Sequence, residues 1–265
     1  MDNSILKSAC IKALKADEAE LAKINELTLS PVTAEQVFTF KVKLCDNEVD
    51  RDTESFTIDA LKKLAELYKG KTGIKDHSAR TDNQISRIYD TEIITEADKL
   101  TALGEEYTYL EAHCYILRIA KNEDLIAEIE AGIKKEVSVL CAMKKRYCSI
   151  CGKEASAFYR TNCEHAVGKL YDGKICCIRL DQAVDAYEFS FVAIPAQRDA
   201  GAKKGEGLEP KAETPVTSEA DKPEEEPQIF ETSETPAEEI EDGADTPSEE
   251  KSLNVFENIF NNLLN

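Results

Sequence analysis

A long acidic segment limits how much of this 265-residue chain can fold. Residues 206–250 hold 17 Asp and Glu against two Lys, together with six of the eight prolines and a single aromatic side chain, Phe230. Such a segment buries too little apolar surface to offset the chain entropy that folding removes. We therefore expect a disordered acidic linker over 203–251, and one folded core of about 165 residues over 36–202, which is long enough for a hydrophobic interior.

Composition also limits the partners and the compartment. Without the acidic segment the net charge moves from −19 to near −4, so the core lacks a basic footprint and we expect no nucleic-acid partner. No apolar run approaches the roughly 20 residues that span a bilayer, and residues 1–4 do not begin a signal peptide. Nine cysteines, an odd number, form no obvious disulfide framework. These features indicate an intracellular protein without a membrane anchor.

Hydrophobic periodicity predicts an α+β fold. An amphipathic helix is expected over Ile58–Tyr68, ending at Gly70, and a second over 122–131, with Asn122 as its N-cap. Strands are expected at 37–44, at 135–143, and on both sides of Gly104 within 84–118. The stretch 180–186 is expected to be a short helix or a turn, and 1–35 an extension of one or two helices.

Cysteine and histidine cluster in the stretch 147–177. The pattern is C-x2-C, eleven residues, then C-x-H, formed by Cys148, Cys151, Cys163 and His165. Four thiolate and imidazole ligands suit tetrahedral Zn2+, and a closed set of four indicates a structural site. Such a metal would stabilise a loop-rich insertion too small for its own core. Cys176 and Cys177 are alternative ligands, and the competing interpretation is a group of ordinary reduced cysteines.

Three separated motifs supply a histidine, a serine and a carboxylate. They are Asp76-His77-Ser78, the run 136–139 around Ser138, and the run 187–192 around Glu188. A serine hydroxyl becomes a good nucleophile when a base takes its proton and a carboxylate orients that base. Strand alternation places Ser138 on the face opposite Cys141, which disfavours a cysteine nucleophile. The competing interpretation is that His77, Ser138 and Glu188 are ordinary loop and strand side chains without a catalytic role.

These segments resemble those of the prohead (capsid maturation) proteases of tailed bacteriophages, which are similar in fold to the herpesvirus assemblins. The resemblance covers roughly 36–202 and is carried, in order, by 47–52, 71–78, 136–139 and 188–196. It implies His77 as the base, Ser138 as the nucleophile and Glu188 as the third member. The 61 positions from His77 to Ser138 fit the family, whereas the 50 from Ser138 to Glu188 are long. The 147–177 insertion accounts for the excess.

The same resemblance implies a barrel-like, mainly antiparallel sheet with peripheral helices. It also implies a serine endopeptidase that cleaves capsid and scaffold proteins, and itself near 200–207, through an acyl-enzyme. The enzyme would act inside the assembling procapsid in the host cytoplasm, and would be weakly active when dilute because self-association controls it. Arg198 is a weak candidate for stabilising the oxyanion.

Several alternatives stay open. His113 is the chief rival as base or third member, although its strand-like surroundings favour a structural histidine. A metalloprotease is disfavoured because the chain lacks His-Glu-x-x-His. A non-enzymatic scaffold or capsid-assembly adaptor explains the zinc-knuckle-like insertion equally well. It also explains residues 252–265, where apolar side chains recur at helical spacing after Ser252 and predict a partner-binding helix.

Overall fold

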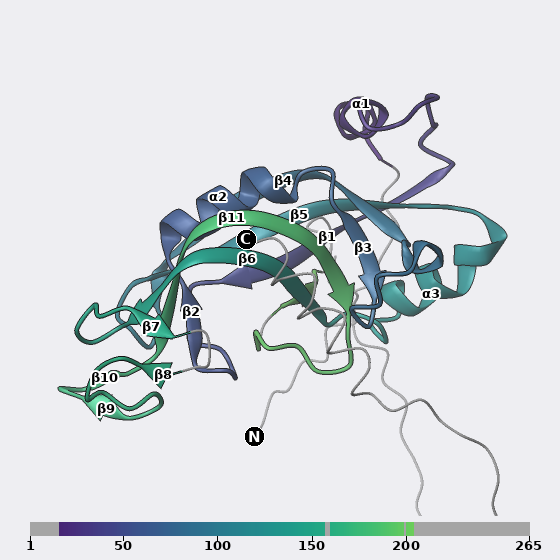
Figure 1. The fold of residues 1–265 in the computed structure, drawn as a ribbon. Coiled ribbons are helices and arrows are strands. Elements are labelled where there is room, and N and C mark those ends of the chain that lie inside the picture. Colours follow the sequence, from purple (N-terminus) through teal and green to yellow (C-terminus); the bar gives the residue numbers. More distant parts are fainter. Residues whose placement is uncertain (1–15, 157–159, 199, 204–265) are drawn as a thin grey trace, which may run out of the picture. The chain divides into compact units, whose positions relative to one another are not determined.

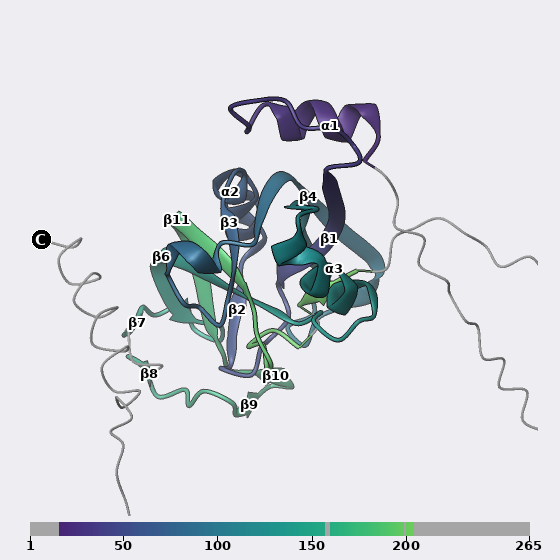
Figure 2. The same cartoon turned by 90° about the vertical axis from the view of Figure 1, so that its right-hand side faces the viewer.

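The structure is a computed structural model, and it describes residues 16–156, 160–198 and 200–203. The N-terminal extension expected over 1–35 is therefore described from Ala16 onward. The linker expected over 203–251 lies outside the described residues except for Lys203, and the helix expected over 252–265 lies wholly outside them. The described part is a mixed α+β fold made mostly of sheet (Figures 1 and 2).

Eight of the described strands form one sheet in the order β12-β1-β5-β4-β3-β11-β2, with β6 also pairing with β11. Its members are β1 (Val37–Asp46), β2 (Glu54–Phe56), β3 (Thr72–Lys75), β4 (Ser86–Leu100), β5 (Glu106–Leu117), β6 (Val137–Cys148), β11 (Ile178–Phe191) and β12 (Gly201–Ala202). The pairings are antiparallel, except that β11 runs parallel to β2 and to β3. The strands expected at 37–44, at 135–143 and on both sides of Gly104 are confirmed.

The expected barrel is met only in part, because the described strands do not close into one. The ladder stops at β12, and an isolated bridge between Glu136 and Gly201 joins that edge to the chain just before β6. A Cβ atom at position 201 would lie 2.6 Å from the Lys135 carbonyl oxygen, so glycine permits this approach. The two-residue strand β12 therefore lies between β1 and the start of β6, but only a single bridge joins it to the β6 side.

Helix α2 (Ile58–Tyr68) has the predicted bounds and lies over β11 (Figure 1). The Thr57 hydroxyl accepts a hydrogen bond from the Ala60 N–H at 3.1 Å and caps the first turn. Leu61, Leu64 and Tyr68 form the buried stripe at helical spacing. Gly70, with φ of +77°, takes the left-handed conformation that ends the helix.

Helix α3 (Glu123–Glu130) was also expected and is confirmed, with its N-cap at the expected residue but without a side-chain capping hydrogen bond. Asn122 occupies the N-cap position, yet its amide donates to the Leu117 carbonyl at 3.0 Å, so it ties the helix to the end of β5. Two 3-10 turns, η1 (Thr81–Asn83) and η2 (Ala120–Asn122), complete the connections.

Helix α1 (Glu18–Asn25) represents the expected N-terminal helical extension. Asp17 and Glu20 form its capping box, and the Tyr89 hydroxyl on β4 donates to Glu20 at 2.6 Å. Ile24 is buried with Val37 and Tyr89, which gives this helix an apolar contact with the sheet. Among the described helices, none is long and apolar enough to span a membrane.

The expectation of a short helix or turn over 180–186 is wrong, because this stretch lies inside β11. Two register shifts, between Ala183 and Asp185 and between Ala186 and Glu188, interrupt its pairing with β6. A bulge places an extra residue in one strand and breaks the alternation that marks a strand in sequence. The partner strand β6 is what keeps this irregular stretch extended.

The 147–177 insertion connects β6 to β11. It contains two small hairpins, β7 (Ala155–Ser156) with β8 (Arg160–Thr161), and β9 (Leu170–Tyr171) with β10 (Lys174–Ile175). Both views place these hairpins at the same end of β6 and β11 (Figures 1 and 2). The insertion therefore extends the β6–β11 hairpin beyond its last paired residues, Cys148 and Ile178.

Gly73 sets how closely β3 and its neighbours pack. A Cβ atom at this position would overlap Ser86 Oγ and the ring of Phe189, which is fully buried in the core. We expect Gly73→Ala to lower the free energy of unfolding by about 1–3 kcal/mol, as overpacking does. Urea unfolding would measure the change.

Gly104→Ala is the matched control, because a Cβ atom there meets nothing within 4 Å and the cost comes only from its φ of +76°. A Gly73→Ala variant as stable as the wild type would show that the Phe189 contact does not control this packing.

Candidate functional site

His77 lies in a tight turn directly after β3. Asp76 and His77 both have positive φ, +52° and +50°, in the left-handed region that side-chain-bearing residues rarely adopt. The Asp76 N–H donates to the Phe191 carbonyl at 3.1 Å, and the His77 N–H donates to Ser190 Oγ at 2.8 Å. Both acceptors belong to β11, so the turn is fixed against the strand that runs parallel to β3.

Glu188 lies on β11 opposite Thr72 of β3 and is only 6% exposed. Its Oε1 atom is 2.7 Å from His77 Nδ1, although the two residues are 111 positions apart in the sequence. With an ionised carboxylate, Nδ1 carries the proton and Nε2 is left as the acceptor. Glu188 Oε2 is buried and has no hydrogen-bond partner among the described residues. Within the described residues, the imidazole is therefore the side-chain partner of this carboxylate.

Ser138 lies on the other side of β11, in the register that puts it directly opposite Ser190. Opposed residues of an antiparallel pair share a face, and so do alternate residues of one strand, so Ser138, Ser190 and Glu188 point to the same side of the sheet. Ser138 is partly exposed, and within the described residues its hydroxyl makes no hydrogen bond. The turn that carries His77 and the strand that carries Ser138 thus lie on the two sides of β11, and no hydrogen bond joins the imidazole to the hydroxyl.

The rival histidine, His113, lies elsewhere in the sheet. His113 lies on β5, separated from β11 by β4 and β3, with its Nε2 3.4 Å from Glu111 Oε1. Lys203 and Lys41 also contact Glu111, at 2.6 and 3.2 Å. Burial opposes ionisation of Glu111, but these three partners lower its pKa to about 2. His113 therefore belongs to a charged network in the sheet and does not reach His77.

Cys141 and Arg198 gain no support as catalytic groups. Burial raises the pKa of the Cys141 thiol to about 12, so it is not a thiolate at neutral pH. Arg198 lines a small hollow of about 80 Å3 together with Asp46, Glu48 and Asp50. None of these neighbours lies in the segments that carry His77, Ser138 or Glu188.

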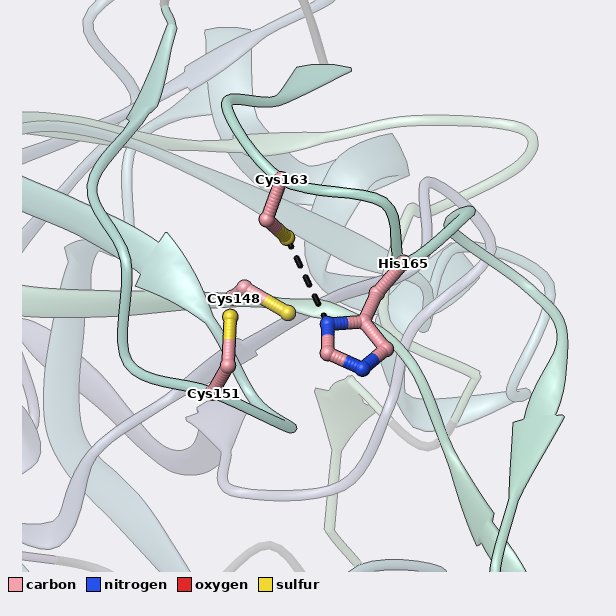
Figure 3. Close-up of side chains that lie close together, drawn as sticks. All are labelled: Cys148, Cys151, Cys163 and His165. Atoms are coloured by element: carbon pink, nitrogen blue, oxygen red, sulfur yellow. Dashed lines mark hydrogen bonds between the residues drawn. The ribbon is translucent and has the colours of Figure 1, made fainter.

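The predicted metal ligands converge on one point of the insertion (Figure 3). One ligand atom from each of Cys148, Cys151, Cys163 and His165 lies within 4.8 Å of all the others. Cys163 Sγ is 3.5 Å from His165 Nδ1, so this nitrogen faces the cysteine side of the group. Ligand atoms around one tetrahedral zinc lie roughly 3.5–4 Å apart, so a small inward movement would complete the set.

The local backbone supports the first two ligands. The Ile150 N–H donates to Cys148 Sγ at 3.4 Å, and Gly152, with φ of +71°, lets the chain turn directly after Cys151. Thr161, followed by His165, lowers the pKa of Cys163 to about 6, toward the thiolate that a metal binds. Cys148 is buried, Cys151 is exposed, and the other two are partly buried. This group can hold a metal ion.

The remaining cysteines lie outside the group. Cys176 Sγ is 3.8 Å from Cys148 Sγ, so it contacts one ligand without joining the set of four. Cys177 is buried and donates its N–H to Ser149 Oγ at 2.9 Å. None of the eight cysteines in the described residues forms a disulfide.

Two residues near these sites were missed by the sequence reasoning. Ser190 bonds the His77 backbone, and its only signal was its place two residues after Glu188 on the same strand face. Asp50 lies in the 47–52 segment, where burial raises the pKa of its carboxyl to about 7. Its Oδ1 atom accepts from the Glu54 and Asp52 N–H groups at 2.8 and 3.0 Å.

Comparison of the chain with protein-family models, with curated proteins and with solved structures finds no match. Function is therefore inferred from the residues themselves. The structure offers an imidazole hydrogen-bonded to a buried carboxylate on the strand that pairs with the Ser138 strand, and a group of three cysteines and a histidine that can hold a metal ion.

Asp50 makes stability depend on pH. Its folded pKa is above that of an unfolded carboxyl, 3.8, so the folded state holds the extra proton and the contribution of Asp50 to stability falls between about pH 4 and pH 7. We expect Asp50→Asn, which keeps the acceptor oxygen, to raise the free energy of unfolding at pH 8 by about 2 kcal/mol.

At pH 3.5 the variant and the wild type should unfold at similar urea concentrations, because Asp50 is then mostly protonated in both the folded and the unfolded state. An equal gain at both pH values would mean that the substitution acts through packing rather than through ionisation.

Proposed function

We propose that this chain is a serine endopeptidase of phage capsid maturation, with Ser138 as nucleophile, His77 as base and Glu188 as the residue that orients the base. The observation that carries the proposal is the 2.7 Å hydrogen bond from His77 Nδ1 to the buried Glu188, next to the strand that bears Ser138. Three segments distant in sequence supply the three groups that a serine hydrolase needs. The resemblance to the prohead proteases rests on these same segments.

In the proposed mechanism, His77 Nε2 takes the Ser138 proton as Oγ attacks the scissile carbonyl. The imidazolium then gives this proton to the leaving amine, and an acyl-enzyme remains. A water molecule, deprotonated by the same nitrogen, releases the acid and regenerates Ser138. Glu188 stabilises the charged imidazole at each step. Ser138 Oγ must move into hydrogen-bond distance of Nε2 on substrate binding, as catalytic contacts of free enzymes often do.

We propose capsid and scaffold proteins as the substrates, and the interior of the procapsid in the host cytoplasm as the place of cleavage, with self-association controlling activity. The resemblance supports this assignment, and the Glu136–Gly201 bridge supports a sheet related to the barrel of that family. For self-cleavage we propose the expected range 200–207. Of these residues, 201–203 are joined to the sheet, since β12 pairs with β1 and Lys203 Nζ lies 2.6 Å from Glu111.

A non-enzymatic scaffold or assembly adaptor is the competing proposal. It is favoured by the missing hydrogen bond between Ser138 and the imidazole, and by a metal-binding group with no open position for chemistry. It leaves the contact between His77 and the buried Glu188 without a role.

We propose that the metal is Zn2+ and that it is structural. Three thiolates and one imidazole form a donor set typical of structural zinc sites. The site joins the two chain segments that follow β6 and β8, in an insertion whose own strands are only two residues long. Bound zinc would supply the stability that such short hairpins lack.

The zinc proposal predicts about one Zn2+ per chain in purified protein, measured by elemental mass spectrometry. Cys151→Ser should abolish most of this content, because one of four ligands is lost. Cys151 is exposed, so the substitution itself disturbs no core packing. Cys141→Ser, on the same strand as Cys148 but outside the group, should keep its zinc. Full metal content in Cys151→Ser would contradict the proposed ligand set.

The protease proposal predicts that co-expression with the major capsid protein of the same virus yields cleaved products. Ser138→Ala, His77→Ala and Glu188→Gln should each reduce cleavage, the first two by at least about a thousandfold. Intact mass spectrometry would identify the products and the positions of the cuts. Labelling of Ser138 by a fluorophosphonate provides a test that needs no natural substrate.

Ser149→Ala is the control, because this serine lies in the insertion and should leave cleavage intact. Uncut capsid protein in assembled particles, together with no fluorophosphonate labelling, would reject the enzyme in favour of the scaffold.

A further inference from the structure

Ser190 is a buried serine that adjoins all three segments of the proposed catalytic site. It lies two residues from Glu188 on β11, directly opposite Ser138 on β6, and its Oγ accepts the backbone N–H of His77. We infer that Ser190 is a positioning residue, which holds the His77 backbone in the left-handed conformation that presents the imidazole to Glu188. This inference rests on the proposed function for its effect on catalysis, but not for its effect on the His77–Glu188 contact.

The turn needs an external restraint. Two consecutive side-chain-bearing residues with φ near +50° are unfavourable, because the Cβ atom crowds the backbone in the left-handed region. Strain of this kind persists where surrounding contacts over-determine the conformation, and it gathers at functional sites. A turn relaxed to negative φ would carry the imidazole away from its present position.

Three backbone N–H groups of the turn donate hydrogen bonds that restrain it. The Asp76 N–H donates to the Phe191 carbonyl at 3.1 Å, and the Ser78 N–H donates to the Lys75 carbonyl at 3.0 Å. The third, from the His77 N–H to Ser190 Oγ at 2.8 Å, is the one made by a side chain. It acts on the residue that carries the imidazole, and a single substitution can remove it.

The burial of Ser190 assigns it to positioning rather than to chemistry. Its exposed area is 0%, so a substrate cannot reach its hydroxyl, whereas Ser138 on the facing strand is partly exposed. Strand β11 thus fixes His77 twice, through Ser190 at the backbone and through Glu188 at the ring. Alternate residues of a strand share a face, which allows one strand to supply both contacts.

The test compares Ser190→Ala with Ser86→Ala. Ser86 is also a buried serine of this sheet, but its Oγ has no hydrogen-bond partner among the described residues, so it controls for the loss of a buried hydroxyl. The first readout is the NMR resonance of the His77 Nδ1 proton, which reports the bond to Glu188. The second is the rate at which a fluorophosphonate labels Ser138.

We expect Ser190→Ala to broaden or lose the Nδ1 proton resonance and to slow labelling by about 10- to 100-fold, the scale of a small misplacement in an active site. Ser86→Ala should change neither. Adding Asp76→Gly to Ser190→Ala should restore part of both signals, because glycine adopts the left-handed conformation without strain. If the Ala variant does not fold, Ser190→Cys keeps the volume with a weaker acceptor, and we expect values between those of serine and alanine.

An unchanged Nδ1 resonance in Ser190→Ala, or equal losses in Ser86→Ala, would overturn the inference. Failure of the proposed function gives a different result. The wild type itself would then resist labelling and leave capsid protein uncut, while the Nδ1 resonance would still report whether Ser190 positions His77.

Discussion

Strand β11 pairs with β3 on one side and with β6 on the other over residues 188–191, and this three-stranded ladder determines where His77, Glu188 and Ser138 lie. The parallel pairing with β3 brings the turn after Lys75 to the end of β11. The antiparallel pairing with β6 sets Ser138 opposite Ser190. A slip of one residue in either register would turn the alternating side chains to the opposite face. The Gly73–Phe189 contact holds the three strands at this spacing.

Burying the Glu188 carboxylate costs free energy unless a hydrogen-bond partner compensates it. A charge removed from water needs a partner, and here one oxygen bonds the imidazole while the other has no partner within the described part of the chain. The His77–Glu188 contact therefore serves both partners, since it orients the ring and compensates the buried acid. The strained turn and the incompletely bonded carboxylate both lower stability, and such features cluster at functional sites.

The Cys148–His165 group that can hold a metal and the proposed Ser138 nucleophile occupy opposite ends of one hairpin. Ser138 and Ser190 pair near one end of β6 and β11, and Cys148 and Ile178 pair at the other. An insertion at the far end can lengthen the chain between Ser138 and Glu188 without altering their register. This accounts physically for the 50 positions between Ser138 and Glu188, and a bound metal would stabilise the added hairpins.

The sequence by itself determined those features that depend on residues close together in the chain. Helix α2 follows from its apolar stripe and Gly70, and the metal-binding group follows from the spacing of its cysteines and histidine, since nearby ligands need little help from the fold to converge. Tertiary structure alone decided the rest. The polar, bulged stretch 180–186 is a strand because β6 pairs with it, Asn122 bonds β5 instead of capping α3, and the sheet remains open. Ser190 gained its contact with His77 only when β3 and β11 paired, because a hydrogen bond across 113 positions depends on strand register, which local periodicity does not encode.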